Sequence, residues 1–133
     1  MSKITNKPPL ITGHITYEIK DGILFIERSE RSIYTEDKIK EYVAKRLAYT
    51  GTHSYPCIIF GKDLLSLDKG ARGYLAGEGA KNVLSRAFVV EKSQGKLAIN
   101  FFIGTNKPPV PTKVFEDLAE AVEWSKQFRQ TTG

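Results

Sequence analysis

The chain has 133 residues, of which 41% are apolar and 26% are charged. This length corresponds to one domain of the usual ~100–200 residues, and the apolar fraction is enough for a single compact core. No stretch approaches the ~18 consecutive apolar residues that span a bilayer, and the first residues lack the apolar run of a secretory signal. We therefore predict a cytoplasmic protein without a membrane span.

The charge balance gives little support for a nucleic-acid partner. An excess of 20 Lys and Arg over 15 Asp and Glu yields a net charge of +5, which favours anionic partners only mildly. The basic residues are scattered and form no stripe with interleaved aromatic residues, so we expect no nucleic-acid binding.

The regular patterns along the chain define one domain over residues 14–129. Residues 1–13, which contain two consecutive prolines, are expected to form a flexible N-terminal segment, and residues 130–133 a polar tail. Alternating apolar residues from His14 to Lys20, and a second segment over 23–28 that begins with the apolar run Ile23-Leu24-Phe25-Ile26, flank the turn signal Asp21-Gly22. This arrangement predicts an antiparallel hairpin.

The next segment predicts an amphipathic helix. Thr35 is a suitable N-cap, Ile39, Val43 and Leu47 recur every four residues, and Gly51 is a suitable stop. Further strands and helices alternate after it. They are a strand at 56–60, a helix from about residue 69 that contains Ala71 and Leu75, a strand at 87–90, a helix capped by Ser93 and ended by Gly104, a strand at 112–115, and a helix from Asp117 with a buried face of Leu118, Ala121, Val122, Ser125 and Phe128.

The predicted order is ββαβαβαβα. The first two strands are antiparallel, and each later crossover through a helix requires a parallel pair. We predict an α/β layered fold with a mixed, mostly parallel sheet of five strands and about four helices.

This order resembles the SpoIIAA-like (STAS) fold of bacterial anti-sigma-factor antagonists. The last third resembles a subgroup in which a helix with an Asn-Phe-Phe pattern, a Pro-containing loop, a strand ending in Phe and a helix ending in Ala-x-x-Trp follow one another. Its residues here are Asn100-Phe101-Phe102, Asn106-Lys107-Pro108, Lys113-Val114-Phe115 and Ala121-Val122-Glu123-Trp124. The resemblance implies a regulatory module.

The resemblance also locates a departure from the family pattern. In the anti-sigma-factor antagonists, a Ser or Thr follows an Asp at the start of the second helix, and its phosphorylation switches partner binding. Asp68-Lys69-Gly70 places Lys69 at that position, and a lysine cannot accept the phosphoryl group as a serine does. Ser66, two residues upstream, is a modification site or an ordinary loop hydroxyl.

Residues with catalytic or metal-binding chemistry are sparse. The two histidines, His14 and His53, make no recognised metal-ligand spacing with Cys57, so we expect no metal and no cofactor. Cys57, the single cysteine, lies in an apolar run and is expected to be a core thiol rather than a nucleophile paired with His53. We predict that the chain is not an enzyme.

Two features of the sequence are typical of binding sites. A helix that begins near Lys69 and carries Arg72 on its first turn presents backbone donors and positive charge to an anion. Phe101, Phe102 and Ile103 cannot all face the core, because consecutive helical positions differ by ~100°. At least one of them packs under the Pro-rich loop, forms a self-association surface, or lines a hydrophobic groove.

Two function classes follow from these features. The first is a non-enzymatic regulatory or protein-interaction module that binds a protein partner or itself as a homodimer. The alternative is a binder of a small anionic or lipid-like ligand in a groove between the second and third helices. The residues expected to bind the partner or ligand are Ser66, Asp68, Lys69, Arg72, Asn100, Phe101, Phe102 and Lys107.

Overall fold

The computed structural model describes residues 4–130. The elements in chain order are β1 (Lys7–Thr12), β2 (Ile15–Lys20), β3 (Ile23–Arg28), β4 (Ser32–Tyr34), α1 (Glu36–Thr50), β5 (Tyr55–Gly61), β6 (Leu64–Leu67), α2 (Lys69–Ala76), the 3-10 helix η1 (Glu78–Ala80), β7 (Val83–Val89), α3 (Ser93–Asn106), β8 (Thr112–Phe115) and α4 (Leu118–Lys126).

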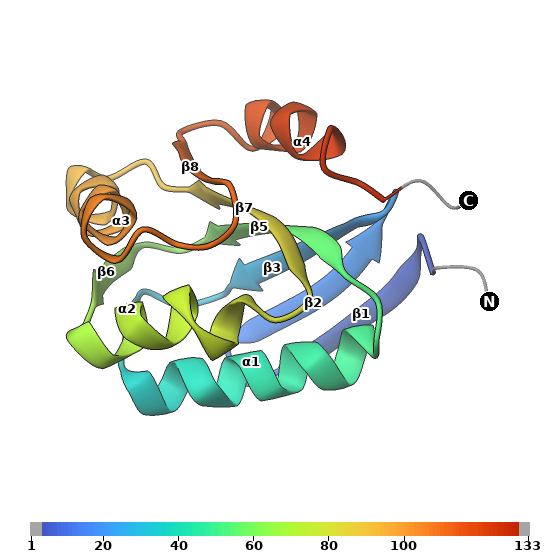
Figure 1. The fold of residues 1–133 in the computed structure, drawn as a ribbon, viewed down its shortest axis with the longest axis horizontal. Helices are drawn as coiled ribbons and strands as arrows, with labels where there is room; N and C mark the ends of the chain where they lie inside the picture. The colour runs from blue at the N-terminus through green and yellow to red at the C-terminus, as the bar shows by residue number, and fades with distance from the viewer. Residues whose placement is uncertain (1–3, 131–133) are drawn as a thin grey trace.

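The main sheet has the strand order β1-β2-β3-β5-β7-β8. The pairs β1/β2 and β2/β3 are antiparallel, and the three pairs that follow are parallel. Helices α1 and α2 cover one face of this sheet and α4 covers the other, while α3 lies beside β8 and β6 (Figure 1). The predicted α/β fold with a mixed, mostly parallel sheet is confirmed, but the sheet has six strands instead of five.

The sixth strand, β1, lies within the segment that we expected to be flexible. Pro8 and Pro9 do not prevent this strand, because an edge strand tolerates prolines where its outer edge pairs with no neighbour and needs no backbone donors. The register of β1 shifts between Lys7 and Leu10, at the two prolines. Tyr49 of α1 holds this strand in place, because its hydroxyl lies 2.8 Å from the carbonyl oxygen of Pro8.

A second, two-stranded parallel sheet of β4 and β6 was also absent from the sequence prediction. Both strands are short, and β6 lies directly before the second helix, where no alternating pattern marks it. The amide of Asp68 donates a hydrogen bond to the carbonyl oxygen of Tyr34, over 3.0 Å. The small sheet thereby fixes where α2 begins.

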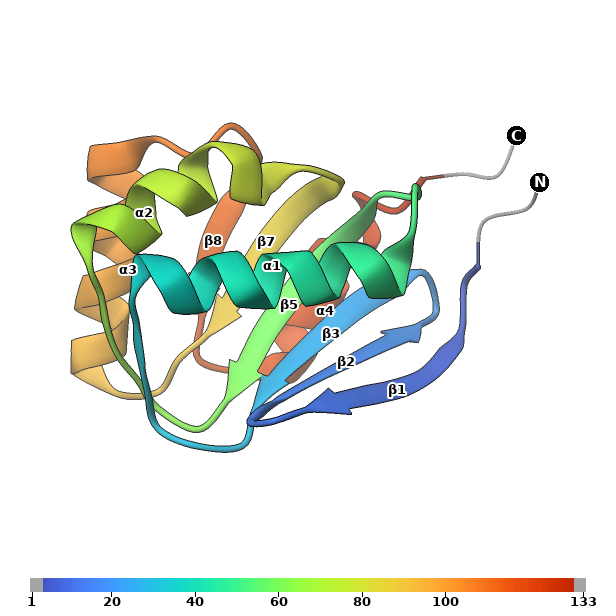
Figure 2. The same ribbon diagram turned by 90° about the horizontal axis from the view of Figure 1, so that it is seen from below.

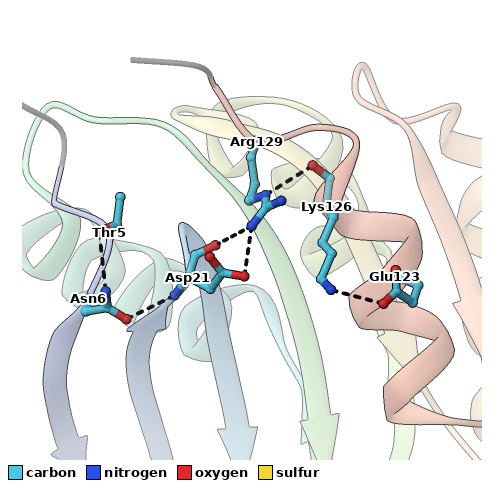
Figure 3. Close-up of polar contacts among 6 residues, drawn as sticks. All are labelled: Thr5, Asn6, Asp21, Glu123, Lys126 and Arg129. Atoms are coloured by element: carbon cyan, nitrogen blue, oxygen red, sulfur yellow. Dashed lines mark hydrogen bonds and ion pairs between the residues drawn. The ribbon is translucent and has the colours of Figure 1, made fainter.

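The β2–β3 turn is held from both ends of the described chain (Figure 3). Asp21 and Gly22 have φ values of 51° and 74°, as the predicted two-residue hairpin turn requires. The Oδ1 atom of Asn6 accepts from the amide of Asp21 over 3.1 Å, and Nη1 of Arg129 forms an ion pair of 2.9 Å with the Asp21 carboxylate. The segment after α4 is therefore tied to the β2–β3 hairpin.

Two apolar cores lie on the two faces of the sheet. The larger one fills the space beneath α1, α2 and α3 and contains Cys57, so the prediction of a core thiol is confirmed. The smaller one lies under α4, where Trp124 packs against Phe115 with ring centroids 5.5 Å apart.

Several local predictions need correction. The buried face of α1 includes Ile39 and Val43 as expected, but it continues through Arg46, while Leu47 is only partly buried. In α4, Ala121 and Ser125 are buried as expected, whereas Val122 and, beyond the end of the helix, Phe128 are only half-buried. Leu118, the first residue of the helix, was also predicted to be buried, but it is 36% exposed.

The ends of α3 also differ from the prediction. The N-cap is Lys92, which makes no side-chain capping hydrogen bond, so Ser93 is the first helical residue rather than the cap. The helix continues past Gly104 and ends at Asn106, and its C-cap Lys107 adopts the left-handed conformation with φ 47°. Pro108 follows and prevents any continuation of the helix.

Candidate functional site

Asp68 is the N-cap of α2. Its Oδ1 atom accepts a hydrogen bond of 2.7 Å from the amide of Ala71, which satisfies one of the free donors of the first turn. Lys69 is the first helical residue, and its side chain is exposed. Ser66 lies two residues before the cap, half-buried in β6 and paired in register with Ile33 of β4.

Arg72 connects α2 to α3. Its Nη1 atom donates to the carbonyl oxygen of Leu67 over 2.9 Å, and its guanidinium carbon lies 4.8 Å from the ring centroid of Phe101. Its Nε atom is buried and has no hydrogen-bond partner among the described residues. The structure thus brings together two predicted site residues that are far apart in the sequence.

The two adjacent phenylalanines of α3 have opposite environments. Phe102 is fully buried and packs edge-on against Phe88 of β7, with centroids 6.4 Å apart. Phe101 is 53% exposed, and Ile103 is half-buried. Phe102 is therefore a core residue in this structure, and Phe101 is the ring that a partner can reach.

The exposed side of α3 extends beyond Phe101. Leu97, one turn earlier, is 71% exposed, and Asn100 is exposed between them. Leu97 was not among the predicted site residues, although its i,i+4 spacing from Phe101 indicates that the two share a helix face. We call the surface formed by Lys69, Arg72, Leu97 and Phe101 the α2–α3 face. Lys107 instead lies at the C-terminal end of α3, where its amide donates a hydrogen bond to the carbonyl oxygen of Ile103.

Lys69 also lines a shallow hollow between α1 and α2, which carries mixed charge. Its lining comprises Glu36, Lys40, Lys69, Gly70, Gly73, Tyr74 and Glu78. Lys40 forms an ion pair of 2.9 Å with Glu36. An anion that approaches Lys69 from this side meets two carboxylates, so the hollow is poorly suited to anion binding.

A polar cleft of about 370 Å³ opens at the carboxyl ends of β3, β5 and β7. Its basic residues, Arg28, Lys62 and Lys92, are interspersed with the acidic Asp63, Glu91, Glu116 and Asp117. Arg28 is fully buried and donates through Nε to the carbonyl oxygen of Lys62, over 2.9 Å. The balance of charges gives this cleft no clear preference for an anion or a cation.

A cavity of about 60 Å³ lies between the sheet and helices α1 and α2. Two buried arginines line it, Arg46 of α1 and Arg86 of β7, next to Cys57 of β5. Sequence reasoning missed both arginines. Arg46 follows Ile39 and Val43 at the i, i+4, i+7 spacing of one helix face, so this periodicity could have predicted its burial.

The chemistry of Cys57 argues against nucleophilic catalysis. Burial raises the pKa of its thiol, and the nearby charges of Arg46 and Arg86 lower it only in part. The thiol is therefore protonated at neutral pH, whereas the thiolate is the reactive form. Within residues 4–130, no group of three or more His, Cys, Asp or Glu side chains is arranged to hold a metal ion.

None of the helices in the described part of the chain is both long enough and apolar enough to cross a membrane.

Comparisons with known proteins identify the family and the fold. The family described as "Domain of unknown function (DUF7793)" matches residues 17–129. A solved structure of an uncharacterised protein from the DUF3478 family with a SpoIIAA-like fold, from Shewanella loihica PV-4, is similar with a TM-score of 0.56. The identity is 15%, and the similarity covers 94% of this chain and 98% of that one. None of the curated proteins matches the sequence. The chain therefore belongs to the DUF7793 family, and its fold is SpoIIAA-like.

Proposed function

We propose that the chain is a non-enzymatic regulatory or protein-interaction module that binds its partner through the α2–α3 face. The observation that carries this proposal is the exposure of Leu97 and Phe101, 71% and 53%, one helical turn apart. Exposure of apolar side chains of this size to water is unfavourable, and their burial by a partner is favourable. Phe101 contacts Arg72 of α2, the helix whose start carries the phosphorylation switch in the family the sequence resembles.

Lys69 gives this face a fixed charge instead of a switchable one. The residue occupies the first position of α2, directly after the Asp68 cap, where the resembled family carries a phosphorylated hydroxyl. The charge of its ammonium group needs no prior modification, so the face attracts an acidic partner as it stands. Ser66 is the nearest hydroxyl upstream, and its modification remains a prediction.

The charges around the apolar pair define the chemistry of the partner. Arg72 lies on one side of the Phe101 ring, and Lys69 is one turn before Arg72 on α2. A complementary protein surface therefore presents an apolar side chain between carboxylates. A second copy of the chain is the first partner to test, because a two-fold interface would pack Leu97 and Phe101 against their own counterparts.

Sedimentation velocity of the purified chain tests self-association. Phe101→Glu is expected to shift a dimer toward monomer, because it places a carboxylate in the centre of the interface. Ile11→Glu is a matched control, because Ile11 is 73% exposed on β1, away from this face. Far-UV circular dichroism confirms that both variants fold. A dimer that survives Phe101→Glu, or is broken equally by Ile11→Glu, rejects this surface for self-association.

A second candidate function is the binding of a small anionic or lipid-like ligand between α2 and α3. The buried Nε atom of Arg72, which has no hydrogen-bond partner among the described residues, favours it. Inorganic phosphate and decanoate are suitable probes for isothermal titration calorimetry. Arg72→Ala and Lys69→Ala should weaken the binding of either probe, whereas Lys126→Ala on α4 should not. Unchanged affinity in the first two variants would remove the start of α2 from consideration.

We also propose a cytoplasmic location. Its support is Cys57, a free thiol in the core, which suits a reducing compartment. Fractionation of cells that make the untagged protein tests this, and recovery of the protein in an extracellular fraction would contradict it.

A further inference from the structure

Two arginines are buried in the larger core without an acidic partner. Arg46 and Arg86 are 4% and 3% exposed, and neither belongs to any ion pair among the described residues. A buried charge is costly unless it is paired or hydrogen-bonded. Two like charges in one place raise this cost further, so the arrangement calls for an explanation.

Backbone carbonyl groups satisfy only some of the guanidinium donors. The carbonyl oxygen of Gly79 accepts from Nη2 of Arg46 over 3.1 Å and from Nη2 of Arg86 over 2.9 Å. Nη1 of Arg46 donates to the carbonyl oxygen of Lys81 over 3.0 Å. Nη1 of Arg86 is buried, and no acceptor of the described residues reaches it. One strong donor is therefore available inside the protein.

Both arginines line the cavity of about 60 Å³ beneath α1 and α2, the two helices that cross the near face of the sheet in Figure 2. On the same measure, one water needs about 10–15 Å³. The cavity is thus large enough for a molecule of several heavy atoms. Its apolar lining includes Ile15, Ile26, Ile39, Val43, Ile59, Leu75, Val83 and Phe88.

We propose that this cavity binds a short-chain monocarboxylate, with its carboxylate on Nη1 of Arg86 and its alkyl chain among the apolar side chains. A carboxylate matches the planar guanidinium donors and supplies the missing negative charge. The apolar lining selects against phosphate, whose other oxygens would lose their hydration without finding donors. This site is separate from the α2–α3 face and does not depend on the function proposed for it.

The charge of Arg86 is consistent with the binding of a carboxylate. Burial lowers its pKa to about 10, and the charge of Arg46 contributes in the same direction. The side chain is nevertheless positively charged at neutral pH. An anion beside it would favour the charged form and relieve its repulsion from Arg46.

Propionate is the probe for a first test on the unchanged protein by methyl NMR. At constant ionic strength, we expect saturable shifts of the Ile59 and Val83 methyl groups and intermolecular NOEs from propionate to them. Chloride and 1-propanol are the controls for charge alone and for the alkyl chain alone, and neither should reproduce these effects. Absence of the NOEs, or equal binding of 1-propanol, would overturn the proposal.

A variant of Arg86 then tests the residue. Arg86→Met removes the charge, keeps an unbranched side chain, and should weaken propionate binding by at least about tenfold. Arg31→Met, at an exposed arginine, is the control and should bind as the parent does. Unchanged affinity in a folded Arg86→Met variant would contradict the proposal. Should that variant not fold, the NMR experiment on the unchanged protein decides alone.

Discussion

Arg72 of α2 lies against the ring of Phe101 of α3, with its guanidinium carbon 4.8 Å from the ring centroid. The contact joins two helices that are separated in the chain by η1 and β7. It covers only part of the ring, because Phe101 is still 53% exposed. The pair therefore both fixes the position of α2 beside α3 and leaves an aromatic surface open to a partner.

A double-mutant cycle should detect this contact. Partly exposed cation–π pairs contribute about 0.5–1 kcal/mol. We expect a coupling energy of this size between Arg72→Ala and Phe101→Ala in urea unfolding. The cycle removes the separate cost of losing the bond from Arg72 to Leu67. A coupling energy indistinguishable from zero would show that the two side chains do not stabilise each other.

The two neighbouring phenylalanines should differ sharply in their contribution to stability. Phe102→Ala is expected to lower the free energy of unfolding by about 3–5 kcal/mol, because it leaves a cavity in the core beside Phe88. Phe101→Ala should cost less than about 1 kcal/mol. Urea unfolding of the two variants under the same conditions measures both values. Similar losses for the two would place Phe101 in the core and contradict the exposed α2–α3 face.

Asp68 should act through its capping bond. Asp68→Ala is expected to lower the free energy of unfolding by about 1 kcal/mol, because the amide of Ala71 loses its acceptor. Asp68→Asn keeps an acceptor oxygen and should retain most of the stability. Thermal unfolding of both variants measures this difference. Equal losses would mean that the charge of Asp68, rather than the capping bond, is what matters.

The protein should lose stability in alkaline solution. Burial raises the pKa of Tyr17 and of Tyr34 above the ordinary value of 10.0. The folded state therefore keeps protons that the unfolded state releases. This contribution is fully present below pH 10.0 and is lost as the pH rises toward the folded pKa values. Arg86, whose pKa is lowered to about 10, acts with the opposite sign and offsets part of the loss.

Urea unfolding from neutral pH to above pH 10 measures this effect. Tyr17→Phe is the matched variant, because it keeps the ring and removes the ionisable hydroxyl, along with its bond to the carbonyl oxygen of Tyr42. At neutral pH this variant should be less stable than the parent protein, because the hydrogen bond is lost. Its free energy of unfolding should then fall less steeply as the pH rises. A stability that is flat or rises above pH 10 in the parent protein would contradict the burial of these hydroxyls.

Local signals in the sequence were sufficient to predict most of the strands and helices. The Asp21-Gly22 turn, the Thr35 cap and the strand at 112–115 are all present as expected. Strand β1 was missed because prolines exclude a central strand but not an edge strand, and the sequence alone does not reveal which edge is free. Strands β4 and β6 are too short to show an alternating pattern.

The candidate site was only partly predictable. Helical spacing required that one of the residues at 101–103 lie outside the core, but only the packing of α3 shows that Phe101 does so. The contact between Arg72 and Phe101 depends on tertiary structure and has no local signal. The buried pair of Arg46 and Arg86 ran against the expectation that arginines are exposed, since such residues are rarely buried without a partner.

Site-specific photocrosslinking in the protein's own cells tests the proposed function most directly. A photoreactive phenylalanine analogue at position 101 replaces one aromatic ring by another, and the same analogue at the exposed position 11 of β1 is the control. The proposal predicts a discrete crosslinked protein, either a second copy or another partner, at position 101 and not at position 11. No crosslink at position 101, or the same products at both positions, would contradict an interaction through the α2–α3 face.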